Sequence, residues 1–200
     1  MRLAPVIVDP RHIHPFADSA AFEAWLSVNH AVEREVWIRI YKLASGTPSI
    51  TPKEAIDVAL CWGWIDAIRK GLDEVSFLQR YTPRGRKSVW SQVNIANIAR
   101  LTAQGRMTGH GLAHVEAARA DGRWDAAYRI KGATVPDDLM VAIDADAAAR
   151  ETFDTLTAQN RFALIFRINA LKTEAGRATA IARFVAMLAR GETLYPQGKR

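Results

Sequence analysis

The sequence predicts an α+β protein, with a small amino-terminal β-sheet and packed helices followed by a helical carboxy-terminal half. Strand-like alternation and a hairpin signal occur only before about residue 84, and amphipathic helical patterns fill the chain after it. With 200 residues, of which 49% are apolar and 24% charged, the chain has the composition of a globular protein. We expect an α+β portion at 1–84, with a hairpin near 64–82, and a helical portion at 85–200 that packs on the first as one compact unit.

The amino-terminal elements follow from local patterns. Residues 6–8 are a short β-like run, and residues 20–28 carry apolar side chains at helical spacing. Residues 36–42 alternate, with Val36 and Ile38 on one face and Trp37 on the other, as in a half-buried strand. Thr51 and Glu54 form a capping box, which opens a helix that Gly63 ends.

A hairpin and a series of helices complete the prediction. Residues 64–69 and 75–82 are expected strands, joined by a tight turn that contains Gly71. Ser91 and Thr108 are expected to cap two helices that end at Gly105 and Gly122. Pro136, followed by two aspartates, marks another helix start. Three further amphipathic helices are expected at residues 147–156, 162–171 and 175–189.

The basic charge is concentrated in one segment. The formal net charge is +6. Residues 69–106 hold eight basic and two acidic side chains, so the rest of the chain is neutral. Such a segment is either a solvated face or a surface for phosphate or another polyanion. Two of its aromatic residues favour a polyanion surface, because Tyr81 and Trp90 could stack on a base, a sugar or an arginine. Trp62 and Trp64 instead fit core packing.

Asp66 is the one candidate for acid–base catalysis. A carboxylate among apolar residues must pair with a cation, accept hydrogen bonds or acquire a raised pKa, and the last is what a general acid needs. Arg69 is near in sequence, although regular strand alternation would put it on the opposite face. We favour a structural ion pair or a backbone hydrogen bond over catalysis.

Other motifs point to no cofactor and no metal site. His110 and His114 are four residues apart, a spacing that can bind a metal, but no third ligand stands at a fixed offset. His12, His14 and His30 receive the same interpretation. Cys61, the single cysteine, lies in an apolar helical stretch and fits a small core residue better than a nucleophile. The chain contains no glycine-rich nucleotide-binding motif.

Several strings resemble the YdeI/OmpD-associated family, also called bacteriocin-protection proteins. They include EAIDVALCWGWID, LDEVSFLQRYTPRGRKSVWSQVN, GRMTGHG, AARADGRWDAAY, VPDDLMVAI, FDTLTAQNRFALIFRINALK and FVAMLARGE, and they run from about Phe22 to Glu192. The resemblance implies a link to envelope stress and to tolerance of cationic antimicrobial peptides or bacteriocins, with porin association by family resemblance. It implies no catalytic residue.

The sequence leaves three functions open: a binding module for an anionic small molecule or acidic partner, a nucleic-acid-binding protein, and an enzyme that uses Asp66 with Arg69 or Arg80. The enzyme is the less favoured. The amino terminus lacks an uninterrupted apolar run and no window is long enough to span a membrane, so we expect a cytoplasmic protein. The candidate ligand-binding residues are Trp64, Asp66, Arg69, Arg80, Tyr81, Arg84, Arg86, Lys87, Ser88, Trp90, Ser91, Asn94 and Arg106.

Overall fold

The computed structural model describes residues 7–129 and 133–197. It confirms the α+β class, with a sheet in the amino-terminal part and a helical carboxy-terminal half. The chain divides into two compact units, Met1–Tyr128 and Arg129–Arg200. Each unit is described by itself below.

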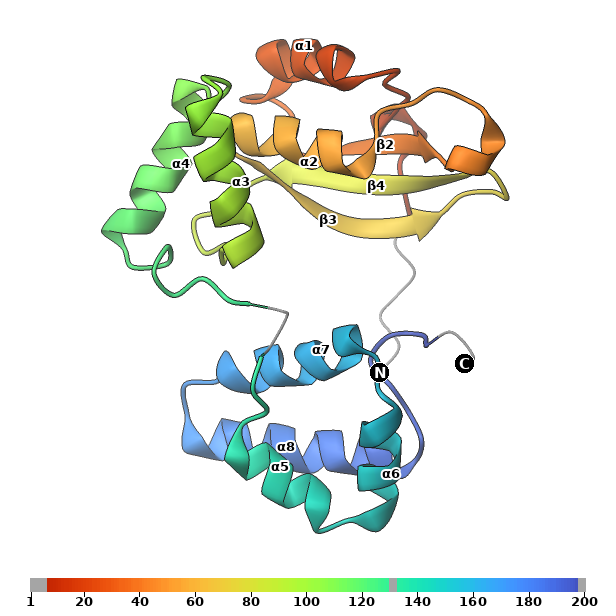
Figure 1. Ribbon diagram of the computed structural model, residues 1–200, viewed down its shortest axis with the longest axis vertical. Helices are drawn as coiled ribbons and strands as arrows, with labels where there is room; N and C mark the ends of the chain where they lie inside the picture. Colours follow the sequence, from red (N-terminus) through yellow and green to blue (C-terminus); the bar gives the residue numbers. More distant parts are fainter. Residues whose placement is uncertain (1–6, 130–132, 198–200) are drawn as a thin grey trace. The chain divides into compact units, whose positions relative to one another are not determined.

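The first unit contains a four-stranded sheet in the order β1-β2-β4-β3 (Figure 1). The short strand β1 (Ile13–His14) is parallel to β2 (Val36–Tyr41). The strand β4 (Ser76–Pro83) pairs antiparallel with β2 and with β3 (Trp64–Gly71), which confirms the predicted hairpin, although Gly71 ends β3 and does not lie in the turn. The prediction of a short strand at residues 6–8 is wrong, because Ile7 and Val8 are irregular. Val6 lies outside the described residues.

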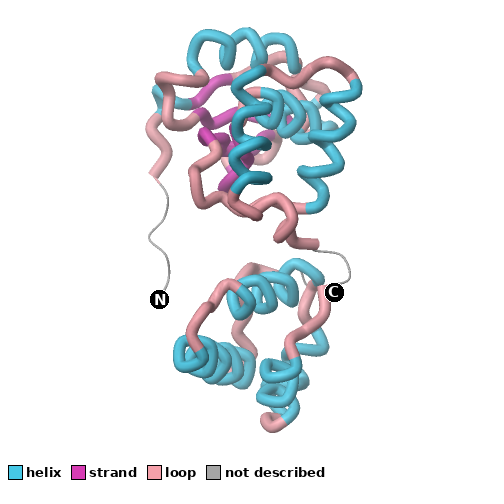
Figure 2. Tube along the Cα trace, turned by 90° about the vertical axis from the view of Figure 1, so that its left-hand side faces the viewer, coloured by secondary structure: helices cyan, strands magenta, loops and turns pink. Residues whose placement is uncertain are grey.

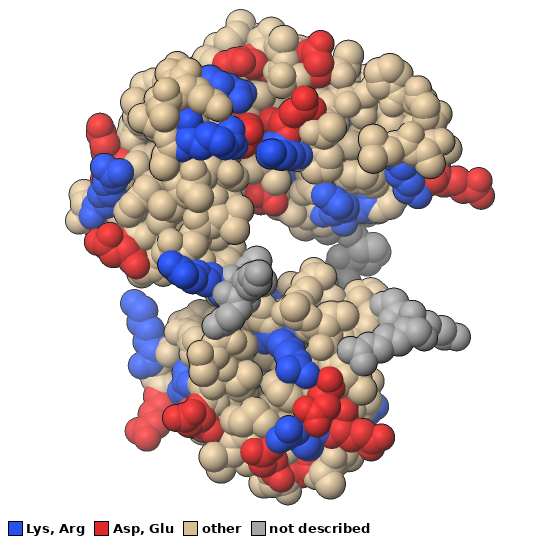
Figure 3. Space-filling view, viewed as in Figure 1, with Lys and Arg blue, Asp and Glu red and all other residues tan. Residues whose placement is uncertain are grey.

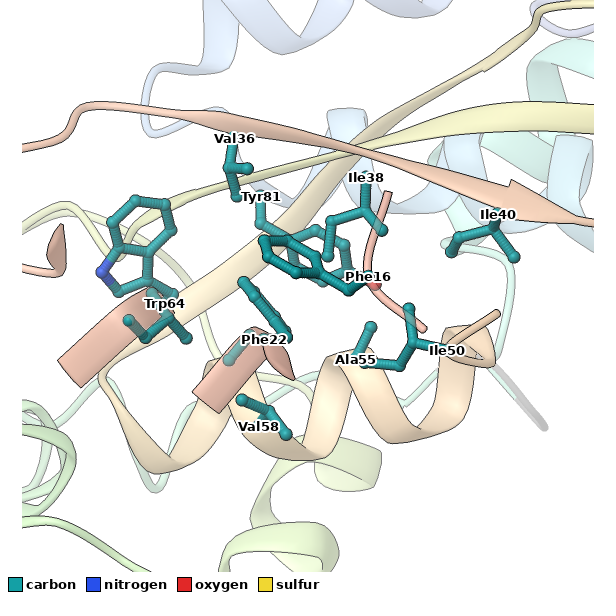
Figure 4. Packing of buried hydrophobic residues seen from close by; sticks show 12 residues of the cluster. Phe16, Phe22, Val36, Ile38, Ile40, Ile50, Ala55, Val58, Trp64 and Tyr81 are labelled. Carbon is teal, nitrogen blue, oxygen red and sulfur yellow. The ribbon is translucent and has the colours of Figure 1, made fainter. Parts of the chain in front are cut away.

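Two helices, α1 (Ser19–Asn29) and α2 (Pro52–Cys61), cover one face of the sheet (Figure 1). The predicted capping box at the start of α2 is complete, because Thr51 and Glu54 each accept from the other's backbone N–H. Apolar side chains from the helices and strands interlock in the core that Figure 4 shows. Its labelled members are Phe16, Phe22, Val36, Ile38, Ile40, Ile50, Ala55, Val58, Trp64 and Tyr81.

Two more helices, α3 (Gln92–Ala103) and α4 (Gly109–Ala120), belong to the same unit. Ser91 and Thr108 cap them as predicted. They pack on α2 through a second apolar cluster, whose buried members are Leu60, Cys61, Trp90, Ile98, Leu101, Val115 and Ala118. The unit ends where the Tyr128 N–H donates to the Trp90 carbonyl at 3.0 Å. The sheet unit therefore extends to residue 128, beyond the predicted division near residue 84.

A β-bulge in β3 changes which side chains share a face. Asp66 pairs with Tyr81 and Arg69 pairs with Gln79, so three residues of β3 span two residues of β4. Tyr81 and Gln79 are two apart and face the same side of the sheet. Asp66 and Arg69 therefore lie on one face, and the expectation that alternation separates them is wrong.

The second unit consists of four helices, and its described residues contain no strand (Figure 2). They are α5 (Asp137–Asp144), α6 (Ala147–Thr155), α7 (Ala158–Asn169) and α8 (Glu174–Ala189). Helix α7 starts earlier than the predicted residue 162 because Thr157 caps it. The buried side chain of Asn160 donates to the Tyr195 carbonyl at 3.0 Å and accepts from the Tyr195 N–H at 2.9 Å, which holds the carboxy-terminal segment against α7.

None of the helices in the described parts of the chain combines the length and the apolar character that a membrane span requires.

Candidate functional site

Three of the sequence motifs meet at the carboxy-terminal end of α2. Gly63 turns the chain out of the helix with φ +71°, a conformation that favours glycine. Its carbonyl accepts from the Arg84 N–H at 2.9 Å. The hydroxyl of Thr108 donates to the last helical carbonyl, that of Cys61, at 2.6 Å. The segments that contain GWID, PRGRKS and GRMT therefore meet at this end of α2, a place that we call the α2 junction.

Helix α4 packs very closely against the α2 junction. A Cβ atom built at Gly111 would lie 2.2 Å from the Cys61 carbonyl oxygen, so only glycine fits there without a backbone shift. A Cβ atom at Gly63 would lie 2.3 Å from Cδ2 of His114. The His114 ring is therefore held directly over Gly63, beside the start of β3.

Arg84 is a buried cation at the centre of this region. Its side chain is only 3% exposed and its guanidinium stacks 3.8 Å from the centre of the Trp90 ring. One nitrogen, Nη1, donates to the Val89 carbonyl at 3.0 Å, whereas the buried Nη2 has no hydrogen-bond partner. Burial lowers the pKa of Arg84 to about 10, although the negative charge of Asp66 opposes this. The guanidinium stays charged at neutral pH, and within the described residues no carboxylate pairs with it.

A pocket of about 290 Å³ opens between the loop after β4 and helix α4; Arg84 does not line it but directly precedes its first lining residue, Gly85. Small residues, basic groups and imidazoles line it. The lining residues are Gly85, Arg86, His110, Ala113, His114, Ala117, Asp121 and Arg123. The positive charges of Arg84 and Arg123 both act on His114, so the buried arginine contributes to the potential in the pocket.

Arg123 is anchored on two sides. Its Nη1 donates to the Ser88 carbonyl at 3.1 Å, which fixes the guanidinium at the loop after β4. Its Nε donates to both oxygens of Asp121 at 2.8 Å, and Nη2 pairs with the same carboxylate. Asp121 is thus the one carboxylate among the lining residues, and it is paired with Arg123.

Two histidines, His110 and His114, line the pocket, and a third, His30, contacts His110. The ring centres of His30 and His110 are 4.3 Å apart, and those of His110 and His114 are 5.9 Å apart. Burial lowers the pKa of His110 and of His114, and the neighbouring positive charges add to this. Both rings are therefore neutral at pH 7. No group of three potential ligands suited to a metal ion occurs within the residues that the structure describes.

Asp66 lies near Arg84 but forms no ion pair in the described part of the chain. Its side chain reaches solvent, yet the protein around it still removes enough water to raise the pKa of the carboxyl. A hydrogen bond to its own backbone and the charges of Arg84 and Arg69 offset part of this effect. The favoured ion pair is absent from the described residues, and the backbone that acts on the pKa of the carboxyl is that of Asp66 itself.

Several predicted site residues lie away from the pocket. Trp64 is buried beside α1, where its Nε1 donates to the His30 carbonyl at 3.3 Å. Tyr81 lies in a strand and is buried against Phe22, so it offers no stacking surface to a ligand. Trp90 is buried as well. It was predicted to stack on a base, a sugar or an arginine, and the structure shows it stacked on Arg84.

The two arginines suggested as substrate ligands beside Asp66 have other roles. Arg80 lies on the opposite face of the sheet and pairs with Glu35 at 2.6 Å. Arg69 donates to Gln79 at 3.0 Å and lies over the Phe77 ring. Neither lines the pocket beside His114, and Arg80 points to the opposite side of the sheet from Asp66, so it is not placed to hold a substrate beside that carboxyl.

The remaining predicted residues divide between the pocket and the helix starts. Arg86 lines the pocket, and Ser88 contributes its carbonyl to Arg123. Lys87 is exposed outside it. The last three lie elsewhere: Ser91 caps α3 by accepting from the Asn94 N–H, and Arg106 is half-buried between α3 and α4.

The basic segment of the sequence does not form one basic surface. Within it, Arg100 pairs with the nearly buried Asp57 at 2.7 Å, Arg80 pairs with Glu35, and Arg84 is enclosed. On the face that Figure 3 shows, basic and acidic side chains are interspersed over this unit. At the pocket, Arg86 from this segment is joined by Arg123 from outside it.

Two family models match the chain. Residues 14–114 match a domain of unknown function, DUF8412, and residues 132–191 match the family described as bacteriocin-protection, YdeI or OmpD-associated. The chain belongs to the DUF8412 family and carries a YdeI/OmpD-associated domain. No curated protein and no solved structure matches it.

The two matches correspond to different units of the fold. The motifs GWID, PRGRKSVWSQVN and GRMT lie in the DUF8412 match, although the sequence resemblance attributed them to the YdeI/OmpD-associated family. That family's model covers the helical unit only, and the resemblance from about Phe22 is too wide in this respect. Four polar or charged pocket residues were not predicted as ligand-binding: His110, His114, Asp121 and Arg123. The spacing of the two histidines was the one available signal.

Proposed function

We propose that the amino-terminal unit binds a small anionic ligand in the pocket beside Arg84. The observation that carries the proposal is the enclosed guanidinium of Arg84, whose Nη2 has no partner and which has no paired carboxylate among the described residues. Arg86 and Arg123 supply positive charge at the pocket itself. The imidazoles of His110 and His114 supply N–H donors there.

The energetics of Arg84 support a functional role. Enclosing a guanidinium costs several kcal/mol unless a counter-ion and hydrogen bonds compensate for lost hydration. Stacking on Trp90 and one bond to the Val89 carbonyl compensate in part. An anion in the adjacent pocket would add favourable charge–charge interaction in a site of low dielectric.

The Arg84→Met variant tests this role, because methionine retains the length of the side chain without its charge. Removal of a buried charge that has no paired carboxylate relieves a desolvation cost of several kcal/mol. Loss of the bond to Val89 and of the stacking on Trp90 costs about 1 kcal/mol each. We therefore expect the free energy of unfolding to be unchanged or up to about 2 kcal/mol higher, with anion binding lost.

The measurement is the melting temperature of the amino-terminal unit, followed by tryptophan fluorescence. All six tryptophans lie in this unit, so the signal reports its unfolding alone. Sodium sulfate is titrated against sodium chloride at matched ionic strength. Sulfate at a hundred times its Kd would stabilise the wild type by about 2.7 kcal/mol. The control is Arg34→Met, an exposed arginine outside the pocket, which should respond as the wild type does.

Two outcomes would contradict the proposal. A large loss of stability in Arg84→Met would show that the charge is structural. A sulfate response that persists in this variant would show that the anion binds elsewhere.

For the whole chain, we propose a role in protection against bacteriocins or other antimicrobial peptides. The support is the description of the family whose model matches residues 132–191. A strain that lacks the protein should become more sensitive to such peptides, and the wild-type chain should restore tolerance. Equal sensitivity of the two strains would contradict this role. Complementation with Arg84→Met then shows whether the pocket contributes to it.

A further inference from the structure

The pocket already contains a carboxylate in the place where a ligand anion would bind. The Asp121 side chain accepts hydrogen bonds from Arg123 with both of its oxygens, at 2.8 Å from Nε. Both residues line the pocket. Arg123 is only 19% exposed and is also tied to the Ser88 carbonyl, whereas the Asp121 side chain is 50% exposed. The carboxylate is therefore the more easily moved partner.

We infer that the pocket takes a phosphate monoester, whose oxyanion displaces the Asp121 carboxylate from the guanidinium of Arg123. The inference rests on the proposed function and specifies the ligand class and the residue that regulates entry. The displaced carboxylate turns into solvent, which the Asp121 side chain already reaches with 50% of its surface.

The directions of the donors favour a tetrahedral oxyanion. Arg86 belongs to the loop after β4, Arg123 follows α4, and His110 and His114 lie on α4 itself. Donors that approach from several elements suit an oxyanion whose acceptors point in several directions, whereas a carboxylate offers two coplanar oxygens. A volume of about 290 Å³ also leaves room for a substituent beyond the oxyanion.

The balance of charges favours exchange. The Asp121 side chain is 50% exposed, and a surface aspartate–arginine pair contributes about 0–1 kcal/mol, because water solvates the released carboxylate well. A phosphate monoester carries a charge of about −1.5 to −2 at pH 7 and presents three strong acceptors. It also interacts with the charge of Arg84, which has no paired carboxylate in the described residues.

Matched probes test the ligand class. Phenyl phosphate and benzoate share a ring and differ in the anion, and isothermal titration calorimetry measures the binding of each to the full chain. We expect phenyl phosphate to bind at least about tenfold more tightly than benzoate, because charge-assisted bonds are worth about 1.5–3 kcal/mol each. Benzoate binding as tightly as phenyl phosphate would overturn the ligand class and leave anion binding intact. Binding of neither probe and no response to sulfate would overturn both.

The Asp121→Asn variant tests the displacement. Asparagine retains the side-chain oxygen that accepts from the Arg123 N–H, and it removes the competing charge. Affinity for phenyl phosphate should rise by up to about fivefold, which corresponds to about 1 kcal/mol. Asp125→Asn is the control, since Asp125 is exposed nearby but does not line the pocket. An equal rise in both variants would show a general effect of net charge and overturn the displacement, as would unchanged or weaker binding in Asp121→Asn.

Discussion

Gly111→Ala tests the close contact between α4 and the α2 junction, which positions the pocket. In an isolated helix this substitution stabilises by about 1 kcal/mol, because alanine has the higher helix propensity. Here the new Cβ would lie 2.2 Å from the oxygen and 2.8 Å from the carbon of the Cys61 carbonyl group. These are backbone atoms at the end of α2, so α4 must move away from α2.

Overpacking of this kind costs about 1–3 kcal/mol, and contact with rigid backbone lies at the upper end of that range. The net expectation is a loss of about 2 kcal/mol, which lowers the melting temperature of a unit of this size by roughly 5–10 °C. Tryptophan fluorescence measures the melting of this unit alone. His114 moves with α4, so sulfate binding should weaken too.

Gly109→Ala is the matched control, because it adds the same methyl group in the first turn of α4 with nothing within 4 Å. It should leave the melting temperature unchanged or raise it slightly. A Gly111→Ala variant as stable as Gly109→Ala would refute the close contact between α4 and α2, and with it the positioning of the pocket.

Three further predictions concern titration and the second unit. Burial raises the pKa of Asp66 above 3.8, so its stabilising contribution is complete below that value and is lost as the pH rises through the folded-state pKa. Asp66→Asn should therefore melt at a higher temperature than the wild type at about pH 7 but not at about pH 3. The pKa of His110 and of His114 lies below 6.5, so the stability of the first unit should fall on acidification below that value, and His114→Gln should reduce the fall measured by tryptophan fluorescence. Asn160→Ala removes both bonds to Tyr195 and should destabilise the second unit by about 1–3 kcal/mol, seen as an earlier loss of helical circular dichroism with unchanged tryptophan melting.

Local signals predicted most of the fold, because caps and periodicity act over a few residues. The capping box at Thr51 and Glu54 and the caps Ser91 and Thr108 gave the helix starts correctly. The bulge in β3 could not be predicted in the same way, since nothing in the residues between Asp66 and Arg69 marks an extra residue. The bulge places Asp66 and Arg69 on the same face of the sheet, whereas regular alternation would separate them.

The site was harder to predict because it depends on contacts between distant parts of the chain. The ion pair of Arg80 with Glu35 joins residues far apart in sequence, and so does that of Arg100 with Asp57. These pairs neutralise two of the eight basic side chains in residues 69–106. The pocket instead uses Arg123, which lies outside that segment and carries its own counter-ion. Burial of Arg84 is a tertiary property, and composition does not reveal it.

The most direct measurement is an anomalous difference map from crystals soaked in sodium selenate, a tetrahedral oxyanion that scatters anomalously. The account predicts a selenium peak in the pocket within hydrogen-bond distance of the Arg123 guanidinium, with the Asp121 carboxylate turned away from it. It also predicts no peak there in crystals of Arg84→Met. A wild-type pocket without a peak, with Asp121 still on Arg123 at a selenate concentration that shifts the melting temperature in solution, would contradict it.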